Sequence, residues 1–415
     1  MRCVAVLSLH TSPLAQPGTG DGGGMNVYVL EMVSALAQAG LECRVYVRRW
    51  NDELPERVEV EPGFEVVHVP AGAADLAKEE LAGIVGSFAD WVAEDLREWK
   101  PDALHANYWL SGVAGQLLKR QLDLPLVTTF HTLARVKAEL GDYEPEQRAH
   151  AEAEVMACAD IVLANCTAEA DQLVRHYDAS RDRIEVVPPG VEHAFFSPGS
   201  QAGARWALDT DNRPLLLFVG RIQPLKGVDV AVRALANVER EDARLWIVGG
   251  ASGTEGDTEV ERIRDLVSSL GLQERVEFRP PQPHHLLSTY YRAADVCLVP
   301  SRSESFGLVA LEAAACGVPV VASAVGGLLT LVEHGHTGYL VESRDPEEYA
   351  GWIDTILRDP VLGRRMSISA AARARTYTWS TSAARLRRLY EDLATQEPVP
   401  CAPPASVVPH DLLVK

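Results

Sequence analysis

Short apolar runs rich in β-branched residues recur along the 415-residue chain, with longer amphipathic segments between them. The runs predict strands at 4–7, 44–47, 66–69, 103–105, 126–129, 161–164 and 184–187, and then at 215–219, 245–248, 276–278, 296–299 and 320–323. Candidate helices between them include 27–38, 82–98, 168–176, 228–238 and 308–316. Such alternation is typical of parallel sheets covered by helices on both faces. It therefore predicts an α/β fold with doubly wound sheets of about five to seven strands each.

The segment 188–199 (PPGVEHAFFSPG) interrupts this alternation, and its proline and glycine content is typical of an inter-domain linker. Two domains are also the expectation from length, at roughly 100–200 residues per domain. We therefore expect the chain to divide as follows: a first Rossmann-like domain at 1–190, a linker at 191–213, a second Rossmann-like domain at 214–378, a helix at 379–395 and a proline-rich, disordered tail at 396–415.

The charge balance narrows the kinds of partner and compartment. A net charge of −19 argues against nucleic-acid or anionic-membrane partners, so a few local cations or backbone N–H groups must hold any anionic ligand. Seven cysteines are scattered without a CxxC pair, mostly in apolar runs, as buried free thiols are. The N-terminus lacks the apolar core of a signal peptide, and no apolar run reaches about 18 residues. These features predict a cytoplasmic protein without integral membrane contact.

A glycine cluster at 18–24 (GTGDGGG) contains the G-x-G-x-x-G pattern of dinucleotide-binding loops. In such loops the first glycine directly follows the first strand, and the second strand ends in an acidic residue. Here Gly18 comes well after the first strand and the second strand runs into Arg48-Arg49-Trp50, so both features argue against NAD. A glycine-rich loop that leads into a helix favours phosphate or diphosphate instead, with a plain flexible loop as the alternative.

Two glutamates, Glu304 and Glu312, flank the start of the predicted helix at 308–316. If the residues between them are mostly helical, the carboxylates lie about 12 Å apart, which is wider than the about 5–9.5 Å of glycosidase pairs. That separation suits an elongated ligand with hydroxyls at both ends and an anion in the middle. Arg221 and Lys226 would supply the cations for this anion, with solvated surface charges as the alternative. The set predicts a site for a nucleotide-sugar.

Three motifs together carry a family resemblance. They are Gly220-Arg-x4-Lys-Gly227, the E-x7-E pair Glu304/Glu312, and Ala322-x3-Gly-Gly327 with Gly335-x2-Thr-Gly338. With these motifs, residues 1–395 resemble the retaining GT-B glycosyltransferases of family 4. The resemblance implies two Rossmann-like domains that face a cleft, a nucleotide-sugar bound mainly by the second domain, and a last helix that crosses back to the first.

The first half is similar to the mycothiol-pathway members of this family at 10–26, 78–81, 108–112 and 131–137. This implies retaining transfer of N-acetylglucosamine from its UDP ester to a hydroxyl of a small polyol phosphate such as inositol phosphate. The implied acceptor site comprises His10, Asp21, Gly22, Gly23, Gly24, Met25, Asn26, Lys78, Tyr108, Thr132 and Arg148. The implied donor site comprises Gln16, Pro17, Gly24, Arg221, Lys226, Gln282, Glu304, Ser305, Phe306, Gly307, Leu308 and Glu312. The implied catalytic residues are His131, Glu304, Arg221 and Lys226, with His131 positioning the sugar.

Three features depart from the family pattern. Gln282 stands where the family has an arginine near the nucleotide, Val318 stands where it has a threonine beside a magnesium site, and the segment 54–63 (LPERVEVEPG) is atypical. No resident cofactor is expected, although a weak Mg²⁺ site remains an option near Tyr291, Arg292, Ala294 and Val318. Two alternatives stay open: a family 4 transferase with an unphosphorylated acceptor and another nucleotide-sugar, and a non-catalytic nucleotide-sugar-binding protein. A homodimer is also left open.

Overall fold

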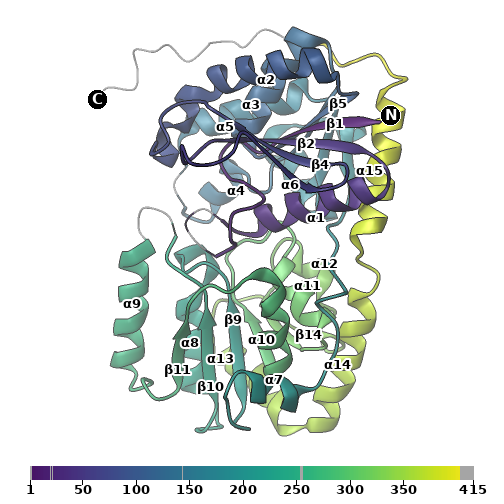
Figure 1. Ribbon diagram of the computed structural model, residues 1–415. Helices are drawn as coiled ribbons and strands as arrows, with labels where there is room; N and C mark the ends of the chain where they lie inside the picture. The colour runs from purple at the N-terminus through teal and green to yellow at the C-terminus, as the bar shows by residue number, and fades with distance from the viewer. Residues whose placement is uncertain (1, 19, 21, 143, 253–255, 402–415) are drawn as a thin grey trace.

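The computed structural model describes residues 2–401 except 19, 21, 143 and 253–255. Two lobes are stacked on one another, and each is built around one sheet (Figure 1). The strands of the first lobe are β1 (Cys3–Leu7), β2 (Glu42–Arg48), β3 (Arg57–Glu61), β4 (Phe64–Val69), β5 (Ala103–Asn107), β6 (Leu126–Thr129), β7 (Ile161–Ala164) and β8 (Ile184–Val186). Those of the second lobe are β9 (Leu215–Val219), β10 (Arg244–Val248), β11 (Val276–Arg279), β12 (Val296–Val299), β13 (Val320–Ser323) and β14 (Gly338–Val341).

Helices cover both faces of each sheet (Figure 1). The first lobe has α1 (Gly24–Gln38), α2 (Val85–Trp99), α3 (Trp109–Leu122), α4 (Ala134–Glu139), α5 (Glu146–Cys158), α6 (Thr167–Tyr177) and the 3-10 helices η1 (Lys78–Ile84) and η2 (Arg181–Arg183). The second has α7 (Gln201–Ala207), α8 (Val228–Asn237), α9 (Gly256–Ser269), α10 (Leu287–Ala293), α11 (Leu308–Ala315), α12 (Leu328–Leu331), α13 (Pro346–Arg358), α14 (Pro360–Ala374), η3 (Pro224–Lys226) and η4 (His284–Leu286). The last helix is α15 (Trp379–Leu393).

The first sheet has the strand order β3-β4-β2-β1-β5-β6-β7-β8, and its neighbouring strands are parallel except at one edge. There β3 pairs antiparallel with β4. This strand corrects two expectations, because the sheet has eight strands and is not wholly parallel. The atypical segment 54–63 contains β3, whose sequence RVEVE alternates valine with charged residues. Such alternation is typical of a strand with one face in solvent, so β3 lacks the continuous apolar run that marks the other strands.

The second sheet is parallel throughout, in the order β11-β10-β9-β12-β13-β14. In both sheets the order reverses beside the first strand of the lobe, between β1 and β5 and between β9 and β12. Ligands of doubly wound sheets bind at the carboxyl ends of the strands at this reversal. The topology therefore selects the loops after β1, β5, β9 and β12 as the places to look for a site.

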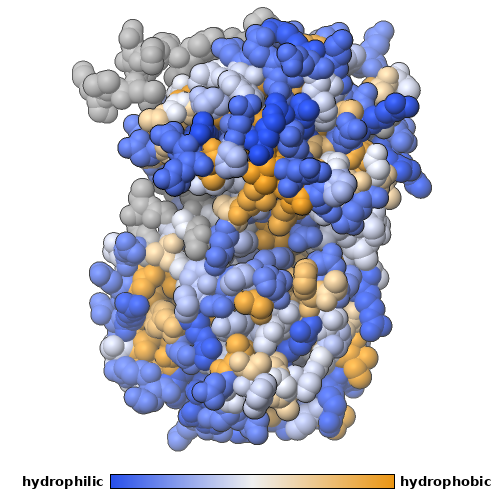
Figure 2. Space-filling view, in the orientation of Figure 1, coloured by the Kyte–Doolittle hydropathy of each residue, from blue (hydrophilic) through white to orange (hydrophobic). Residues whose placement is uncertain are grey.

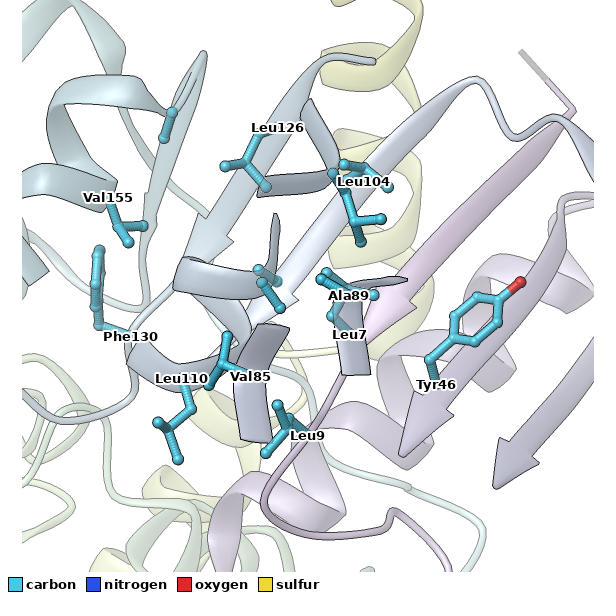
Figure 3. Packing of buried hydrophobic residues seen from close by; sticks show 14 of the residues in the cluster. Leu7, Leu9, Tyr46, Val85, Ala89, Leu104, Leu110, Leu126, Phe130 and Val155 are labelled. Carbon is cyan, nitrogen blue, oxygen red and sulfur yellow. The ribbon is translucent and has the colours of Figure 1, made fainter. Parts of the chain in front are cut away.

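The core of the first lobe fills the space between the sheet and the helices α2, α3 and α5 (Figure 3). Its fully buried members include Leu7, Leu9, Tyr46, Val85, Ala89, Leu104, Leu110, Leu126, Phe130 and Val155. On α2 the buried positions follow helical spacing, with Val85, Phe88, Ala89, Val92 and Leu96 on one face. Burial of each large apolar side chain contributes about 1.5–3 kcal/mol, so this face fixes α2 on the sheet.

Hydrophilic residues cover most of the face shown in Figure 2, and apolar residues gather in its middle, where the lobes meet near α1. A hydrophilic surface fits the net charge of −19. Within the described part of the chain, no helix combines the length and the apolar character needed to cross a bilayer.

The chain passes between the lobes twice, once after β8 and once before α15, and hydrogen bonds join the two passages. Ser382 Oγ donates to the carbonyl oxygen of Pro188 at 2.6 Å. The N–H of Val191 donates to the carbonyl oxygen of Tyr377 at 3.3 Å. Both passages therefore lie side by side and form one connection between the lobes.

The last helix, α15, lies along the first lobe although it follows the second in sequence (Figure 1). Leu386 and Tyr390 are fully buried in a cluster with Val33 of α1 and Val45 of β2. Tyr390 also shares a hydrogen bond with His105 at the centre of the sheet, with 2.7 Å between the phenol oxygen and Nδ1. The helix thus completes the core of the first lobe.

The segment predicted as a linker at 191–213 contains α7, which packs on the second lobe. Arg205 Nη2 lies 2.7 Å from Asp295 Oδ2, and Gln201 Nε2 donates to the carbonyl oxygen of Ala294 at 3.1 Å. The second lobe therefore begins within the expected linker. Seven residues of helix are too short to show helical periodicity in the sequence.

The tail expected to be disordered from 396 is described as far as Cys401, and 402–415 lie outside the described residues. Cys401 forms a disulfide with Cys158 at the end of α5, and the N–H of Val399 donates to Asp160 Oδ1 at 2.6 Å. These contacts hold residues 399–401 against the first lobe, which corrects the expectation of disorder there, and they add one disulfide to a set of cysteines expected to be mostly free thiols. The two cysteines are 243 residues apart, so no short spacing motif in the sequence indicates that they pair. The free cysteines are Cys3, Cys43, Cys166, Cys297 and Cys316.

Replacing Cys401 with serine is expected to lower the free energy of unfolding by about 2–5 kcal/mol, because the disulfide restricts the unfolded chain. Thermal unfolding with and without dithiothreitol measures this. The reductant should lower the melting temperature of the wild type and leave that of Cys401→Ser unchanged. Cys3→Ser, which removes a free thiol, is the control and should respond to the reductant as the wild type does. A wild-type melting temperature that is the same with and without the reductant would contradict the presence of this disulfide.

Candidate functional site

A cavity of about 280 Å³ lies between the lobes, at the carboxyl ends of β9 and β12 and the start of α1. Many residues that the sequence predicted for the site line this cavity. They are Pro17, Gly23, Gly24, Met25, His131, Thr132, Arg221, Lys226, Gln282, Glu304, Ser305, Phe306, Gly307, Leu308 and Glu312. The cavity therefore lies at the reversal of the second sheet, and the glycine loop of the first lobe forms part of its wall.

Lys226 ends η3 on the loop after β9, and it lies against Glu304. Its Nζ lies 2.5 Å from Glu304 Oε1, which also accepts a hydrogen bond from Ser301 Oγ at 2.9 Å. Gly227 makes this approach feasible, because its φ is +72° and an added Cβ would lie 2.2 Å from the carbonyl oxygen of Pro300. The structure thus brings a cation and a carboxylate together at the cavity wall, each partly exposed.

Two glycines, Gly326 and Gly327, pack against the backbone of Glu304. The N–H of Gly327 donates to the carbonyl oxygen of Glu304 at 3.0 Å. Gly326 has a φ of +47°, and an added Cβ would lie 1.8 Å from that same oxygen. The glycine pair of the third sequence motif is therefore a steric requirement of the loop that carries Glu304.

Arg221 follows β9 and contacts the glycine loop of the first lobe. An added Cβ on Gly23 would lie 3.2 Å from Arg221 Nε. Arg221 Nη1 donates to Ser252 Oγ at 3.3 Å, and Ser252 Oγ donates to the carbonyl oxygen of Gly20 at 2.6 Å. The loop over the cavity and the cationic loop of the second lobe are therefore in direct contact.

Other predicted members of the glycine loop hold the loop itself together. Asn26 is only 1% exposed, and its Oδ1 accepts from the N–H of Gly23 at 2.8 Å while its Nδ2 donates to Thr11 Oγ1 at 2.6 Å. Gln16 Nε2 donates to the carbonyl oxygen of Pro281 in the second lobe at 3.3 Å. Gly22 is buried, and Asp21 lies outside the described residues.

At the far end of the cavity, Glu312 lies inside α11 and is 5% exposed. His284 Nε2 donates to its Oε1 at 2.7 Å, and the Tyr291 hydroxyl donates to its Oε2 at 2.8 Å. Sequence reasoning did not assign these roles to His284 and Tyr291. The available signal was the histidine pair that follows Gln282 in PQPHH.

The start of α11 lies between the two glutamates, as the sequence predicted. Gly307 caps it with a φ of +101°, and an added Cβ would lie 2.7 Å from Leu328 Cδ2. Ser305 and Phe306 precede it, and Leu308 is its first residue. Gln282 turns back on its own loop, where its Nε2 donates to the carbonyl oxygen of Pro280 at 2.9 Å.

His131 follows β6 with a φ of +64°, a backbone conformation that costs energy for a residue other than glycine. Its Nε2 donates to Asn107 Oδ1 at 2.9 Å, and its ring meets Tyr28 edge-on at 4.8 Å between centroids. Burial, with the charge of His105, lowers the pKa of His131 to about 3. The imidazole is therefore neutral at neutral pH and acts through hydrogen bonds rather than charge.

A second group of predicted residues meets in the first lobe, around Tyr108. The centroids of the His10 and Tyr108 rings are 4.2 Å apart. The Arg148 guanidinium also packs on the Tyr108 ring, with its Cζ 5.0 Å from the ring centroid. Arg148 Nη2 donates to Thr132 Oγ1 at 2.9 Å. His10, Tyr108, Thr132 and Arg148 thus form one cluster, although His10, Tyr108 and Arg148 do not line the cavity.

The positive charges of the site converge on His10. Burial first, and then the charges of the cations Lys78, Arg221 and Arg148, hold the pKa of His10 well below its usual value. Lys78 is exposed at the start of η1. The arrangement would favour an anion, which lowers the repulsion between neighbouring cations.

The side chains at the four positions of the Mg²⁺ option are poor ligands for a metal ion. The Tyr291 hydroxyl donates to Glu312, Arg292 places a guanidinium at the site, and Val318 is apolar. The carbonyl oxygen of Ala294 accepts from Gln201 Nε2 at 3.1 Å. Mg²⁺ prefers several oxygen ligands in octahedral geometry, which the side chains of these four positions do not offer. Among the described residues, moreover, no three His, Cys, Asp or Glu side chains are grouped to hold a metal ion.

Two family models match the chain, namely Glycosyltransferase Family 4 over residues 22–195 and Glycosyl transferases group 1 over residues 204–375. The D-inositol 3-phosphate glycosyltransferase of Xylanimonas cellulosilytica is 47% identical over 95% of this chain and 98% of its own. Among solved structures, sucrose-phosphate synthase from Thermosynechococcus elongatus has a TM-score of 0.89 at 32% identity, over 95% of this chain and all of the other. Anabaena HepE, solved in complex with UDP and glucose, has a TM-score of 0.76 at 20% identity over 94% of this chain and all of its own, which shows the shared fold.

The two facing Rossmann-like lobes confirm the GT-B fold that the sequence predicted. The family models and the identity to curated glycosyltransferases confirm an enzyme that transfers sugars. The chain belongs to glycosyltransferase family 4.

Proposed function

We propose that the enzyme transfers N-acetylglucosamine from UDP-N-acetylglucosamine, with retention of configuration, to a hydroxyl of an inositol phosphate. One observation carries the proposal: a cavity lined by two cations and two carboxylates lies beside a separate cationic cluster in the other lobe. A donor site and a phosphorylated acceptor need these two features. The name of the 47% identical relative supports the acceptor, and the UDP and glucose bound by Anabaena HepE support the donor class.

In this proposal the second lobe binds the donor. Arg221 and Lys226 contact the diphosphate, Glu312 accepts hydrogen bonds from the ribose diol, and Glu304 accepts them from the sugar hydroxyls. An incoming diphosphate gives Lys226 a second anionic partner besides Glu304. The N–H groups at the start of α11 add further donors for the phosphate oxygens.

During transfer the bond between the sugar anomeric carbon and the diphosphate oxygen breaks, and a bond to the acceptor oxygen forms on the same face. The acceptor hydroxyl gives its proton to the departing phosphate oxygen, and UDP leaves with this proton. Arg221 and Lys226 stabilise the charge that develops on the leaving diphosphate. Neutral His131 positions the sugar by hydrogen bonding. Contact between the lobes excludes water, which favours transfer over hydrolysis.

The acceptor phosphate would lie at the cluster of His10, Tyr108, Thr132 and Arg148, with Lys78 as the exposed cation. A dianion beside several cations and hydroxyl donors forms charge-assisted hydrogen bonds. Lys78 is exposed at the start of the 3-10 helix η1, where a ligand can approach it from solvent.

A second candidate, transfer to an unphosphorylated acceptor, is favoured by the contacts of Arg148. This side chain is 5% exposed, its Nε donates to Glu152 Oε1 at 2.8 Å, and its Nη1 lies 2.9 Å from Glu144 Oε1. Two carboxylates compensate its charge, so Arg148 acts as part of the scaffold in this candidate. The two candidates differ in the role of Lys78.

Mass-spectrometric product detection separates them, with UDP-N-acetylglucosamine and UDP-glucose each tested against inositol phosphates and inositol. Lys78→Gln is expected to raise the acceptor KM about ten-fold or more for inositol phosphate with kcat changed little, because it removes one charge-assisted contact. Lys100→Gln, at another exposed lysine, is the control and should match the wild type. Equal turnover of inositol and inositol phosphate, with an unchanged KM in Lys78→Gln, would favour the unphosphorylated acceptor instead.

A further inference from the structure

The carboxylate of Glu312 is held from two sides by the second lobe. His284 Nε2 lies 2.7 Å from one oxygen, and the Tyr291 hydroxyl lies 2.8 Å from the other. Each carboxylate oxygen can accept a further hydrogen bond beyond these. The two contacts therefore fix the plane of the carboxylate and leave acceptor capacity for a ligand in the cavity.

His284 and Tyr291 differ in whether their side chains reach the cavity. It lines the cavity itself, whereas Tyr291 is fully buried behind Glu312. Its ring packs 5.0 Å from that of Phe196, in the segment that joins the lobes. The imidazole is thus a wall of the donor cavity and, at the same time, a hydrogen-bond donor to Glu312.

The charges around His284 come from both lobes. Burial by itself would lower the pKa of His284, but the charge and hydrogen bond of Glu312, together with the charge of Glu31, raise it. Glu31 belongs to α1 in the first lobe, and burial raises its own pKa to about 7, with Glu192, Glu312 and Glu61 adding to the rise and His284 opposing it. The carboxylate charges therefore favour the protonated imidazole, and the direct contact among them is the one from His284 Nε2 to Glu312 Oε1 at 2.7 Å.

We propose that His284 is a positioning residue for donor binding: the hydrogen bond from its Nε2 orients the Glu312 carboxylate toward the ribose diol. The inference rests on the proposed function, in which Glu312 accepts the ribose hydroxyls. Without the imidazole, Glu312 keeps only the hydrogen bond from the Tyr291 hydroxyl. The carboxylate plane is then no longer fixed from both sides, which weakens its hydrogen bonds to the diol.

Calorimetric binding of UDP and 2′-deoxy-UDP tests this without any acceptor or sugar. The variants are His284→Phe, which removes the donor and keeps a ring, and His284→Gln, whose side-chain N–H₂ can donate to Glu312. His285→Phe is the matched control, because His285 is the exposed neighbour and its side chain has no contact with Glu312. Thermal unfolding of every variant shows whether it is folded.

The expected result is that His284→Phe binds UDP on the order of ten-fold more weakly than the wild type, while His285→Phe binds as the wild type does. The wild type should prefer UDP over 2′-deoxy-UDP, His284→Phe should bind both about equally, and His284→Gln should regain most of the preference. A folded His284→Phe that keeps the wild-type preference would overturn the role of His284. A wild type that binds ADP or GDP but not UDP would overturn the proposed donor instead, and the ribose comparison would then be made with that nucleotide and its 2′-deoxy form.

Discussion

Lys226→Ala is expected to lower the rate of sugar transfer by a factor on the order of 10²–10³. The variant removes a cation from the leaving diphosphate, and loss of one preorganised group at developing charge has costs of this size. It also leaves Glu304, whose Oε1 lies 2.5 Å from Lys226 Nζ, without its counter-ion. Steady-state kinetics with saturating donor measure the effect, which should appear mainly in kcat.

Two further variants separate the roles of Lys226. Lys226→Arg keeps the charge and should retain more activity than Lys226→Ala, although its wider head fits the Gly227 loop less well. Combining Lys226→Ala with Glu304→Gln restores charge balance, so it should recover thermal stability but not transfer. A kcat within three-fold of the wild type in Lys226→Ala would remove this lysine from the catalytic set.

Gly326→Ala is expected to lower transfer by a factor on the order of 10², because the added methyl group would overlap the carbonyl oxygen of Glu304. The ideal Cβ lies 1.8 Å from that oxygen, so the loop that carries Glu304 must move. A displacement of about 1 Å at a reacting group can cost this much. The measurement is kcat and donor KM, with circular dichroism to confirm the fold.

Gly335→Ala is a matched control for this variant. Gly335 also has a positive φ, of +78°, but nothing lies within 4 Å of its ideal Cβ. Both alanine variants carry a similar backbone strain, of about 1 kcal/mol, so both should lose some stability. If Gly335→Ala loses as much activity as Gly326→Ala, backbone strain rather than displacement of Glu304 explains the loss.

The fold was predictable where a buried strand appears in the sequence as a continuous run of apolar residues. Each of the twelve strands predicted from apolar runs is present, with ends that differ by no more than two residues. The edge strand β3 was missed because its valines alternate with charged residues, and β14 was missed because GYLV begins with glycine. Long-range pairing left no signal at all, so the disulfide between Cys158 and Cys401 had to be seen in the structure.

The candidate site was predictable where its residues follow strands. The loops after β9 and β12 meet at the reversal of the sheet, so Arg221, Lys226 and Glu304 could be grouped from order alone. Hydrogen-bond partners could not be predicted in this way. Asn26 was assigned to the acceptor, yet its side chain forms hydrogen bonds with Thr11, Ser12 and Gly23 of its own loop. His284 was not assigned, although it contacts Glu312.

The placement of α15 has a consequence for how the protein is made. Ribosomes release the chain from its N-terminus, and N-terminal domains commonly fold first. Here Leu386 and Tyr390, which emerge only after the whole second lobe, fill the core of the lobe that emerges first. The surface of α1 and the centre of the sheet at His105 therefore stay uncovered while the whole second lobe is synthesised. The first lobe reaches its final form only when translation of α15 is complete, so both lobes mature together.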